Sequence, residues 1–204
     1  MAAIAIPIFE QVNARLGPER NSPVRGRRKP LVKAEKISTP RDGDVFSISL
    51  GDGTAAVGQV VSSYLASHYV VLFDFVAPED EVGSRISDAL QSKTLFGGLT
   101  FDALFFRPGR WTILENRAVD SEKYLPAYKT GASDLGNCKV EDFKSKRSRA
   151  ASDIAAENIP FRKTSAPVIF ERAMKAYLGL EPWHTAFDGV SLGDVVISAE
   201  LFGD

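Results

Sequence analysis

The sequence is poor in residues that stabilise small proteins through sulfur or metal. Its 204 residues include one cysteine, Cys138, and two histidines, His68 and His184. A single cysteine excludes an internal disulfide, and a zinc site built from several thiolates is excluded with it. We therefore expect no metal and no cofactor. The scarcity of cysteine is also typical of a protein of the reducing cytoplasm.

Long apolar runs are missing as well. No stretch approaches the roughly 18 consecutive apolar residues that a membrane-spanning helix needs. The apolar fraction of 44% and the charged fraction of 25% are ordinary for a globular protein. A chain of this length buries about 70% of its unfolded surface and needs no covalent staple. We expect a globular cytoplasmic protein with no membrane partner.

The usual signatures of enzymes are not found. Gly97-Gly98-Leu99-Thr100 lacks the spacing of a phosphate-binding loop, and no G-x-G-x-x-G motif opens a strand–turn–helix unit. A nucleophilic pair of Cys138 with a histidine is compatible with the residue types, but such pairs arise in most sequences by chance. We expect no catalytic residue and no metal ligand.

Charge is distributed unevenly along the chain. Residues 15–36 hold eight lysines or arginines and two glutamates, a balance of +6, so the remainder carries −7 of the total of −1. The glycines and prolines among these charges disfavour helices and strands. We expect residues 1–40 to form a basic, largely extended arm and residues 41–204 to form one domain. The arm is either a nucleic-acid anchor or, as we favour, a solvated linker, since no aromatic residue interleaves it.

Alternation of apolar and polar residues predicts a hairpin at the start of the domain. Residues 46–50 alternate, and Gly51-Asp52-Gly53 separates them from a second apolar run at 55–61. Glycine and aspartate tolerate the backbone angles of tight turns. Small residues at Ala56 and Gly58 predict that another group packs closely over that face.

Two further patterns predict strands. Residues 69–76 are almost continuously apolar, which is typical of a central strand. Asp74 lies within this run, either as an acid–base group or, as we favour, as a carboxylate satisfied by backbone N–H groups or an arginine. A second hairpin is predicted for 100–107 and 110–115, around the turn at Pro108-Gly109.

Helical spacing predicts two amphipathic helices. The first lies near 80–92, where Val82, Ile86 and Ala89 share one face, and Gly97-Gly98 breaks the pattern. The second spans 167–179, with Ser165 as its cap. The face of the second helix that we expect in the core comprises Phe170, Ala173, Met174 and Tyr177.

These elements predict an α+β fold. We expect a twisted antiparallel sheet, or a partly open small barrel, covered by two or three helices. The expected core comprises Phe46, Ile48, Leu50, Val60, Val71, Phe73, Phe101, Phe105 and Ile113.

Residues 43–61 read Gly-Asp-Val-Phe-Ser-Ile-Ser-Leu-Gly-Asp-Gly-Thr-Ala-Ala-Val-Gly-Gln-Val-Val. This segment resembles the opening of immunity protein family 26 of bacterial polymorphic toxin systems. Residues 71–74, 101–105, 109–111 and 126–129 are similar to later parts of that family in the same order, so the resemblance covers about 41–130, with a weaker similarity in the helix around 170–179. The basic arm departs from the family pattern. The resemblance implies a non-enzymatic protein that binds and neutralises a cognate toxin.

An acidic body suits a basic partner such as a nucleic-acid-cleaving toxin. The partner-binding residues that we predict are Glu79, Asp80, Glu81, Arg107, Arg110 and Trp111. Tryptophan and arginine are enriched in binding hot spots, although a core position is an equal alternative for Trp111 and for Trp183.

The second functional hypothesis is a nucleic-acid-binding module that uses the arm at 15–36. An enzyme using Asp74 or Cys138 is the third and weakest hypothesis. The oligomeric state stays open.

Overall fold

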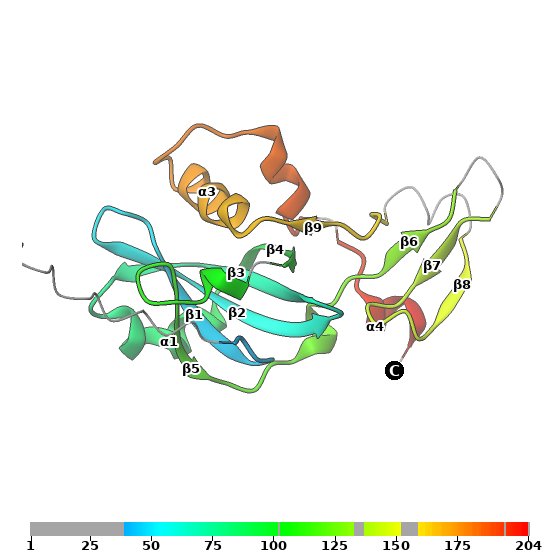
Figure 1. The fold of residues 1–204 in the computed structure, drawn as a ribbon, viewed down its shortest axis with the longest axis horizontal. Helices are drawn as coiled ribbons and strands as arrows, with labels where there is room; N and C mark the ends of the chain where they lie inside the picture. Colours follow the sequence, from blue (N-terminus) through cyan, green and yellow to red (C-terminus); the bar gives the residue numbers. More distant parts are fainter. Residues whose placement is uncertain (1–38, 102, 133–136, 152–158, 194, 204) are drawn as a thin grey trace, which may run out of the picture. The chain divides into compact units, whose positions relative to one another are not determined.

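The computed structural model of the chain describes residues 39–101, 103–132, 137–151, 159–193 and 195–203 (Figure 1). The chain divides into Met1–Ala34 and Glu35–Asp204, and every described residue belongs to the second part. The predicted basic arm at 1–40 therefore lies outside the described residues, except for its last two.

A six-stranded sheet forms the larger part of the described fold, with strand order β5-β1-β2-β3-β4-β9. Its strands are β1 (Asp44–Ser49), β2 (Thr54–Tyr64), β3 (Ser67–Pro78), β4 (Thr94–Thr100), β5 (Trp111–Asn116) and β9 (Thr164–Ser165). Neighbouring strands are antiparallel, except that β4 and β9 run parallel. The predicted hairpin (β1–β2) and the predicted central strand (β3) are both confirmed.

The small residue Gly58 is explained by a close contact within this sheet. A Cβ atom at Gly58 would lie 2.5 Å from the ring of Phe46 and 2.6 Å from Leu72. Only glycine leaves room for both side chains to cross the strand here. The expectation of close packing over this face is confirmed.

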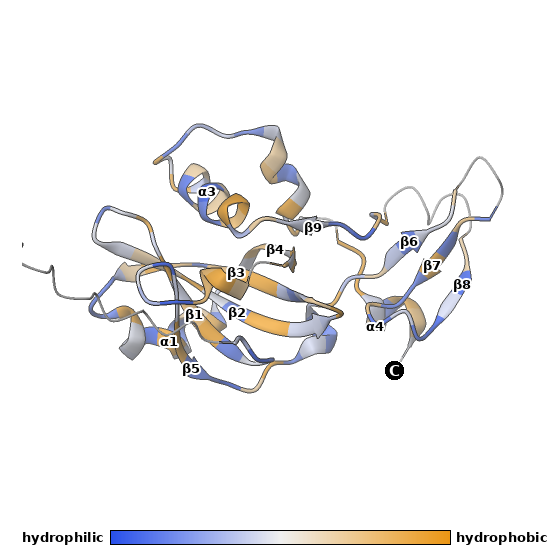
Figure 2. Ribbon diagram, in the orientation of Figure 1, coloured by the Kyte–Doolittle hydropathy of each residue, from blue (hydrophilic) through white to orange (hydrophobic). Residues whose placement is uncertain are grey.

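The two faces of the sheet are covered by different helices. On one face α3 (Pro167–Tyr177) buries Phe170, Ala173 and Met174 against the core. On the other face η1 (Val82–Arg85) and α1 (Ile86–Gln91) bury their apolar residues. Figure 1 shows α3 and α1 on opposite sides of the strands, and Figure 2 shows apolar residues along β2 and β3. Because β3 is covered on both sides, its sequence is apolar at nearly every position.

A second sheet of three short antiparallel strands follows in the chain. Its strands are β6 (Tyr128–Thr130), β7 (Lys139–Glu141) and β8 (Ser148–Ala150). The remaining helices are η2 (Ala103–Phe105), η3 (Ser121–Lys123), η5 (Thr185–Val190) and α4 (Ser198–Phe202). The predicted α+β class is confirmed, and the described strands close no barrel.

The predicted second hairpin is wrong. β4 ends at Thr100, the chain turns through η2, and β5 pairs with β1, where Trp111 lies opposite Ile48. The turn at Pro108-Gly109 therefore connects a helical segment to a strand that pairs far back in the sequence.

Two predictions about single residues are also wrong. Phe101, expected in the core, is 57% exposed because the chain leaves the sheet at that point. Ser165 does not cap α3, whose N-cap is Ala166 without a side-chain hydrogen bond. Ser165 instead pairs with Thr100 in β9.

Candidate functional site

The predicted acidic segment and the predicted arginine turn lie at the same end of the large sheet. Glu79 accepts a hydrogen bond of 2.5 Å from the Ser49 hydroxyl at the end of β1, and its N–H donates to Gly53. β5 begins beside the same end of β1, so the turn at 107–110 that precedes it lies there too. Asp80 and Glu81 are exposed in the turn before η1. Charged residues that are far apart in the sequence thus lie at the same end of the large sheet.

Trp111 does not belong to this surface. Its ring is fully buried and stacks on Phe46 at 4.7 Å between centroids, with an interplanar angle of 4°. Phe106 and Phe170 meet it edge-on. We correct its assignment from partner-binding residue to core residue, because a side chain without exposed area cannot contact a partner in the folded state.

The arginines of the turn differ in exposure. Arg110 is exposed, and its guanidinium lies 5.6 Å from the centre of the Phe105 ring. Arg107 is half-buried and its carbonyl closes the turn by accepting from the N–H of Arg110. Arg110 is therefore the residue of this turn that is best placed to meet a partner.

A second surface, formed by the C-terminal end of α3 and the loop after it, is richer in exposed apolar side chains. Tyr177, Leu178, Leu180 and Trp183 are between 38% and 49% exposed. The rings of Tyr177 and Trp183 both lie on Phe96, at 6.2 and 6.3 Å between centroids. We call these four residues the aromatic surface. Clustered exposed apolar residues of this kind mark interaction sites.

Two carboxylates hold the rings of the aromatic surface in place. The Tyr177 hydroxyl donates to Asp74 at 3.1 Å, and the Trp183 indole N–H donates to Asp188 at 2.9 Å. The hydrogen bond to Asp74 raises the pKa of the Tyr177 phenol above its ordinary value, so the phenol remains a donor. Fixed aromatic rings lose little conformational freedom on binding.

Asp74 departs in part from its expected environment. It is exposed rather than buried, since the β3–β4 register shifts next to it, between Leu72 and Phe73. Its carboxylate is satisfied, as the favoured interpretation requires, but by a tyrosine hydroxyl rather than by backbone N–H groups or an arginine. The helical spacing of Tyr177 predicted a core residue, and its exposure was missed for that reason.

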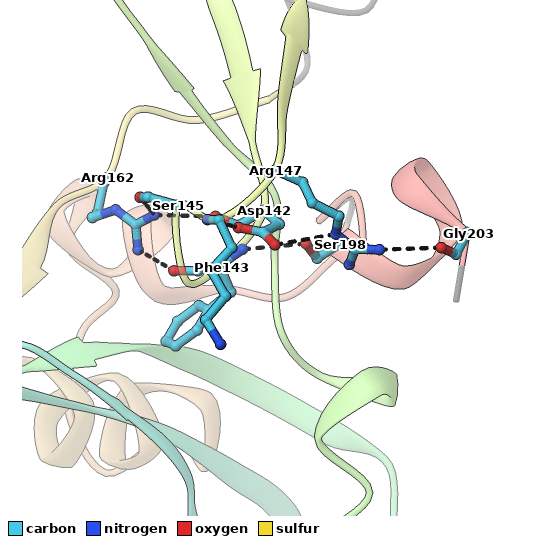
Figure 3. Close-up of polar contacts among 8 residues, drawn as sticks. Asp142, Phe143, Ser145, Arg147, Arg162, Ser198 and Gly203 are labelled. Carbon is cyan, nitrogen blue, oxygen red and sulfur yellow. Dashed lines mark hydrogen bonds and ion pairs between the residues drawn. The ribbon is translucent and has the colours of Figure 1, made fainter.

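Polar contacts around the β7–β8 turn form a third cluster (Figure 3). Arg162 donates to the carbonyls of Phe143 and Asp142, at 2.9 and 3.3 Å. The Asp142 carboxylate accepts from the N–H of Lys146 and from the Arg147 guanidinium. Burial opposes ionisation, yet these hydrogen bonds lower the pKa of Asp142 below its ordinary value. Because its groups satisfy one another, we assign this cluster to stability.

The described part of the chain also bears on metal, thiol and membrane chemistry. Within it, no group of three or more histidine, cysteine, aspartate or glutamate side chains could hold a metal ion. Cys138 is a free, half-buried thiol. None of the described helices has the length and apolar character needed to cross a membrane. Comparisons of the chain with protein-family models, curated proteins and solved structures find no match.

Proposed function

We propose that this chain is a non-enzymatic protein that binds a basic protein partner through the aromatic surface and neutralises it by occlusion. The observation that carries the proposal is the pair of half-exposed rings, Tyr177 and Trp183, packed on Phe96 and fixed by Asp74 and Asp188. Tyrosine and tryptophan dominate binding hot spots because they bury a large area and carry one polar atom each.

Negative charge borders the aromatic surface. Asp74 touches Tyr177, and β3 continues from Asp74 to the acidic segment Glu79, Asp80 and Glu81, about 16 Å further on at roughly 3.3 Å per residue. An apolar centre with an acidic margin fits a partner that presents an apolar contact among lysines and arginines. The charges would also accelerate encounter at low salt.

The identification of the partner as a toxin domain depends on the resemblance of residues 41–130 to immunity protein family 26. Residues that carry this resemblance, such as Phe46, Gly58 and Trp111, lie in the core of the large sheet. The resemblance therefore supports a shared framework, while the aromatic surface lies outside residues 41–130, with Leu180 and Trp183 also beyond the weaker similarity at 170–179, and would determine which toxin is bound.

The experiment begins with the tagged full chain, purified from its native host at moderate salt. The stoichiometric protein that accompanies it is identified, and its candidate toxin domain is expressed alone and together with the chain. We expect the domain alone to arrest growth and the chain to restore growth. Trp183→Ala is expected to weaken binding by about 30-fold or more, as truncation of a hot-spot residue does. Leu65→Ala is the matched control, since Leu65 is 89% exposed and lies in the β2–β3 turn.

Three results would contradict this function. The partner could bind Trp183→Ala and Leu65→Ala with the same affinity, or it could fail to arrest growth. The third contradicting result is that the purified chain brings down nucleic acid in place of a protein. Nucleic acid that is released as salt rises, and that is lost on deletion of residues 1–36, would instead support binding through the basic arm at 15–36.

A further inference from the structure

A cavity of about 420 Å³ opens between the large and the small sheet, and its wall includes Asp188, which also accepts from Trp183 of the aromatic surface. Its wall includes Tyr69 of β3, Gly97 of β4 and Tyr128 of β6. The segment around Lys163, residues of the segment 188–193 and Val195 complete it. A volume of this size lies within the range of small-molecule sites.

The pairing of β4 explains why the cavity exists. The outer edge of β4 bridges to Ser191 at Phe96 and pairs with β9 at Leu99 and Thr100. Gly97 and Gly98 lie between these two pairings and line the cavity. A Cβ atom at Gly97 would lie 2.9 Å from Leu192 and 3.1 Å from the Tyr69 hydroxyl. The glycine therefore brings the backbone next to this hydroxyl.

Two buried phenols contribute polar atoms to the wall. Tyr69 is 1% exposed and Tyr128 is 6% exposed, and neither hydroxyl has a hydrogen-bond partner among the described residues. Burial raises the pKa of both phenols, so both stay protonated and can donate. Neither phenol oxygen is among the fully buried polar atoms that lack a partner in the described residues, so both oxygens open onto the cavity, where a ligand would supply an acceptor.

Lys163 supplies the positive charge among the described residues that line the cavity. The Lys163 ammonium lies against Gly189 on the wall and has no hydrogen-bond or ion-pair partner in the described part of the chain. Arg162 stacks on the Tyr128 ring at 4.2 Å, and Lys129 lies 4.9 Å from the centre of the Phe161 ring. The acidic group on the wall, Asp188, already accepts the indole N–H of Trp183.

We propose that this cavity binds a small aromatic anion, a carboxylate or sulfonate with one or two rings. The rings of the ligand would lie against Tyr128 and Phe161, and its acidic group would accept from Lys163 and from the hydroxyl of Tyr69. Such a site combines an apolar wall with a few convergent donors, as ligand sites do. This site adjoins the proposed partner surface through Asp188, but the proposal does not rest on the proposed function.

Fluorescence titration of the full chain tests the proposal with two probes. The first is 8-anilinonaphthalene-1-sulfonate, and the second is N-phenyl-1-naphthylamine, which has the same rings without the acidic group. We expect saturable binding of one sulfonate probe per chain, with much weaker binding of the neutral probe. Lys163→Met is expected to weaken sulfonate binding by about tenfold, as loss of a charged hydrogen bond does, and to leave the neutral probe unaffected. Lys93→Met is the charge control, because Lys93 is an exposed lysine just before β4 and does not line the cavity.

A second pair of variants tests whether the probe occupies the cavity itself. Gly193 lines the cavity and a side chain there meets no atom within 4 Å, so Gly193→Trp should fold and should block both probes. Gly83→Trp, in equally open space on η1, is the matched control and should change neither titration. Non-saturable binding, equal effects of Lys163→Met and Lys93→Met, or unchanged binding in Gly193→Trp would each overturn the proposal.

Discussion

The two sheets of this protein are stabilised by different interactions. The large sheet is built around stacked and edge-on aromatic rings, with Phe46, Trp111 and Phe170 all fully buried. The small sheet has three strands of three residues each, and β8 is exposed along its whole length. Its apolar cluster is small, with Ala127, Val140 and Ile159 as the buried members. Arg162 ties it to the large sheet, since its guanidinium lies 4.1 Å from the centre of the Tyr64 ring on β2 and 4.2 Å from that of Tyr128 on β6.

This difference implies that the two sheets unfold in different ways. Apolar burial is additive over many contacts, so loss of one core side chain lowers the stability of the whole large sheet. A small sheet held by a few directional contacts can open locally while the large sheet stays folded. Global unfolding and local opening are separable measurements, which makes the comparison testable.

The most damaging substitution should be Trp111→Ala. Removing a fully buried indole leaves a cavity among Phe46, Phe106 and Phe170. We expect the free energy of unfolding to fall by about 3–5 kcal/mol, as for other buried aromatic residues. Urea denaturation of the full chain measures this loss. Trp183→Ala, at the half-exposed tryptophan, should cost less than about 1 kcal/mol, and equal losses for the two variants would contradict the assignment of Trp111 to the core.

Arg162→Met should act mainly on the small sheet, since its hydrogen bonds to Phe143 and Asp142 lie there. The variant keeps part of the apolar stem but removes the donors to the Phe143 and Asp142 carbonyls. We expect a loss of about 1–3 kcal/mol, seen as faster amide hydrogen exchange at 128–150 with little change at 44–78. Arg172→Met, which breaks the exposed ion pair with Glu181, is the control and should cost less than about 1 kcal/mol. Uniformly faster exchange in both sheets would show that the two do not open separately.

The sequence predicts the large sheet better than the small one, and the predictions that are wrong for the large sheet have a physical cause. The β1–β2 hairpin and β3 follow from local alternation and turn residues, because each strand pairs with its neighbour in the sequence. β4 was missed since Gly97-Gly98 carry no apolar side chain. Its strand conformation is set by antiparallel pairing with β3, which no local pattern contains.

The candidate sites were less predictable because exposure is a tertiary property. Trp111 and Trp183 each follow turn residues, yet one is fully buried and the other is 49% exposed. The acidic segment at 79–81 is predicted as a partner-binding site from its charge alone. The pairing of Tyr177 with Asp74 joins positions 103 residues apart, and the sequence contains no signal for it.

The smallest effect should come from a polar contact at the edge of the aromatic core. Glu171 accepts from the Trp111 indole at 3.0 Å. Burial raises the pKa of Glu171, although Trp111, Arg110 and Lys175 oppose that effect. The folded state therefore holds this proton more tightly than the unfolded state, and stability falls as pH rises through the raised pKa.

Glu171→Gln should remove that penalty while keeping an acceptor for Trp111. We expect the Tm of the variant to exceed that of the parent by about 1–2 °C at pH 7, with the gain vanishing at a pH below the ordinary pKa of glutamate. Thermal unfolding across this pH range measures the difference. A gain that grows as pH falls would reverse the sign and contradict the buried, pKa-raised environment of Glu171.

The assignment of the aromatic surface is tested best by amide hydrogen exchange on the full chain, alone and with the partner isolated as described above. We predict slower exchange in the complex at residues 175–188 and at 74–81, with no change at 139–150. Protection confined to 139–150, or to no described segment, would show that the partner binds elsewhere and would contradict the proposed function of Tyr177 and Trp183.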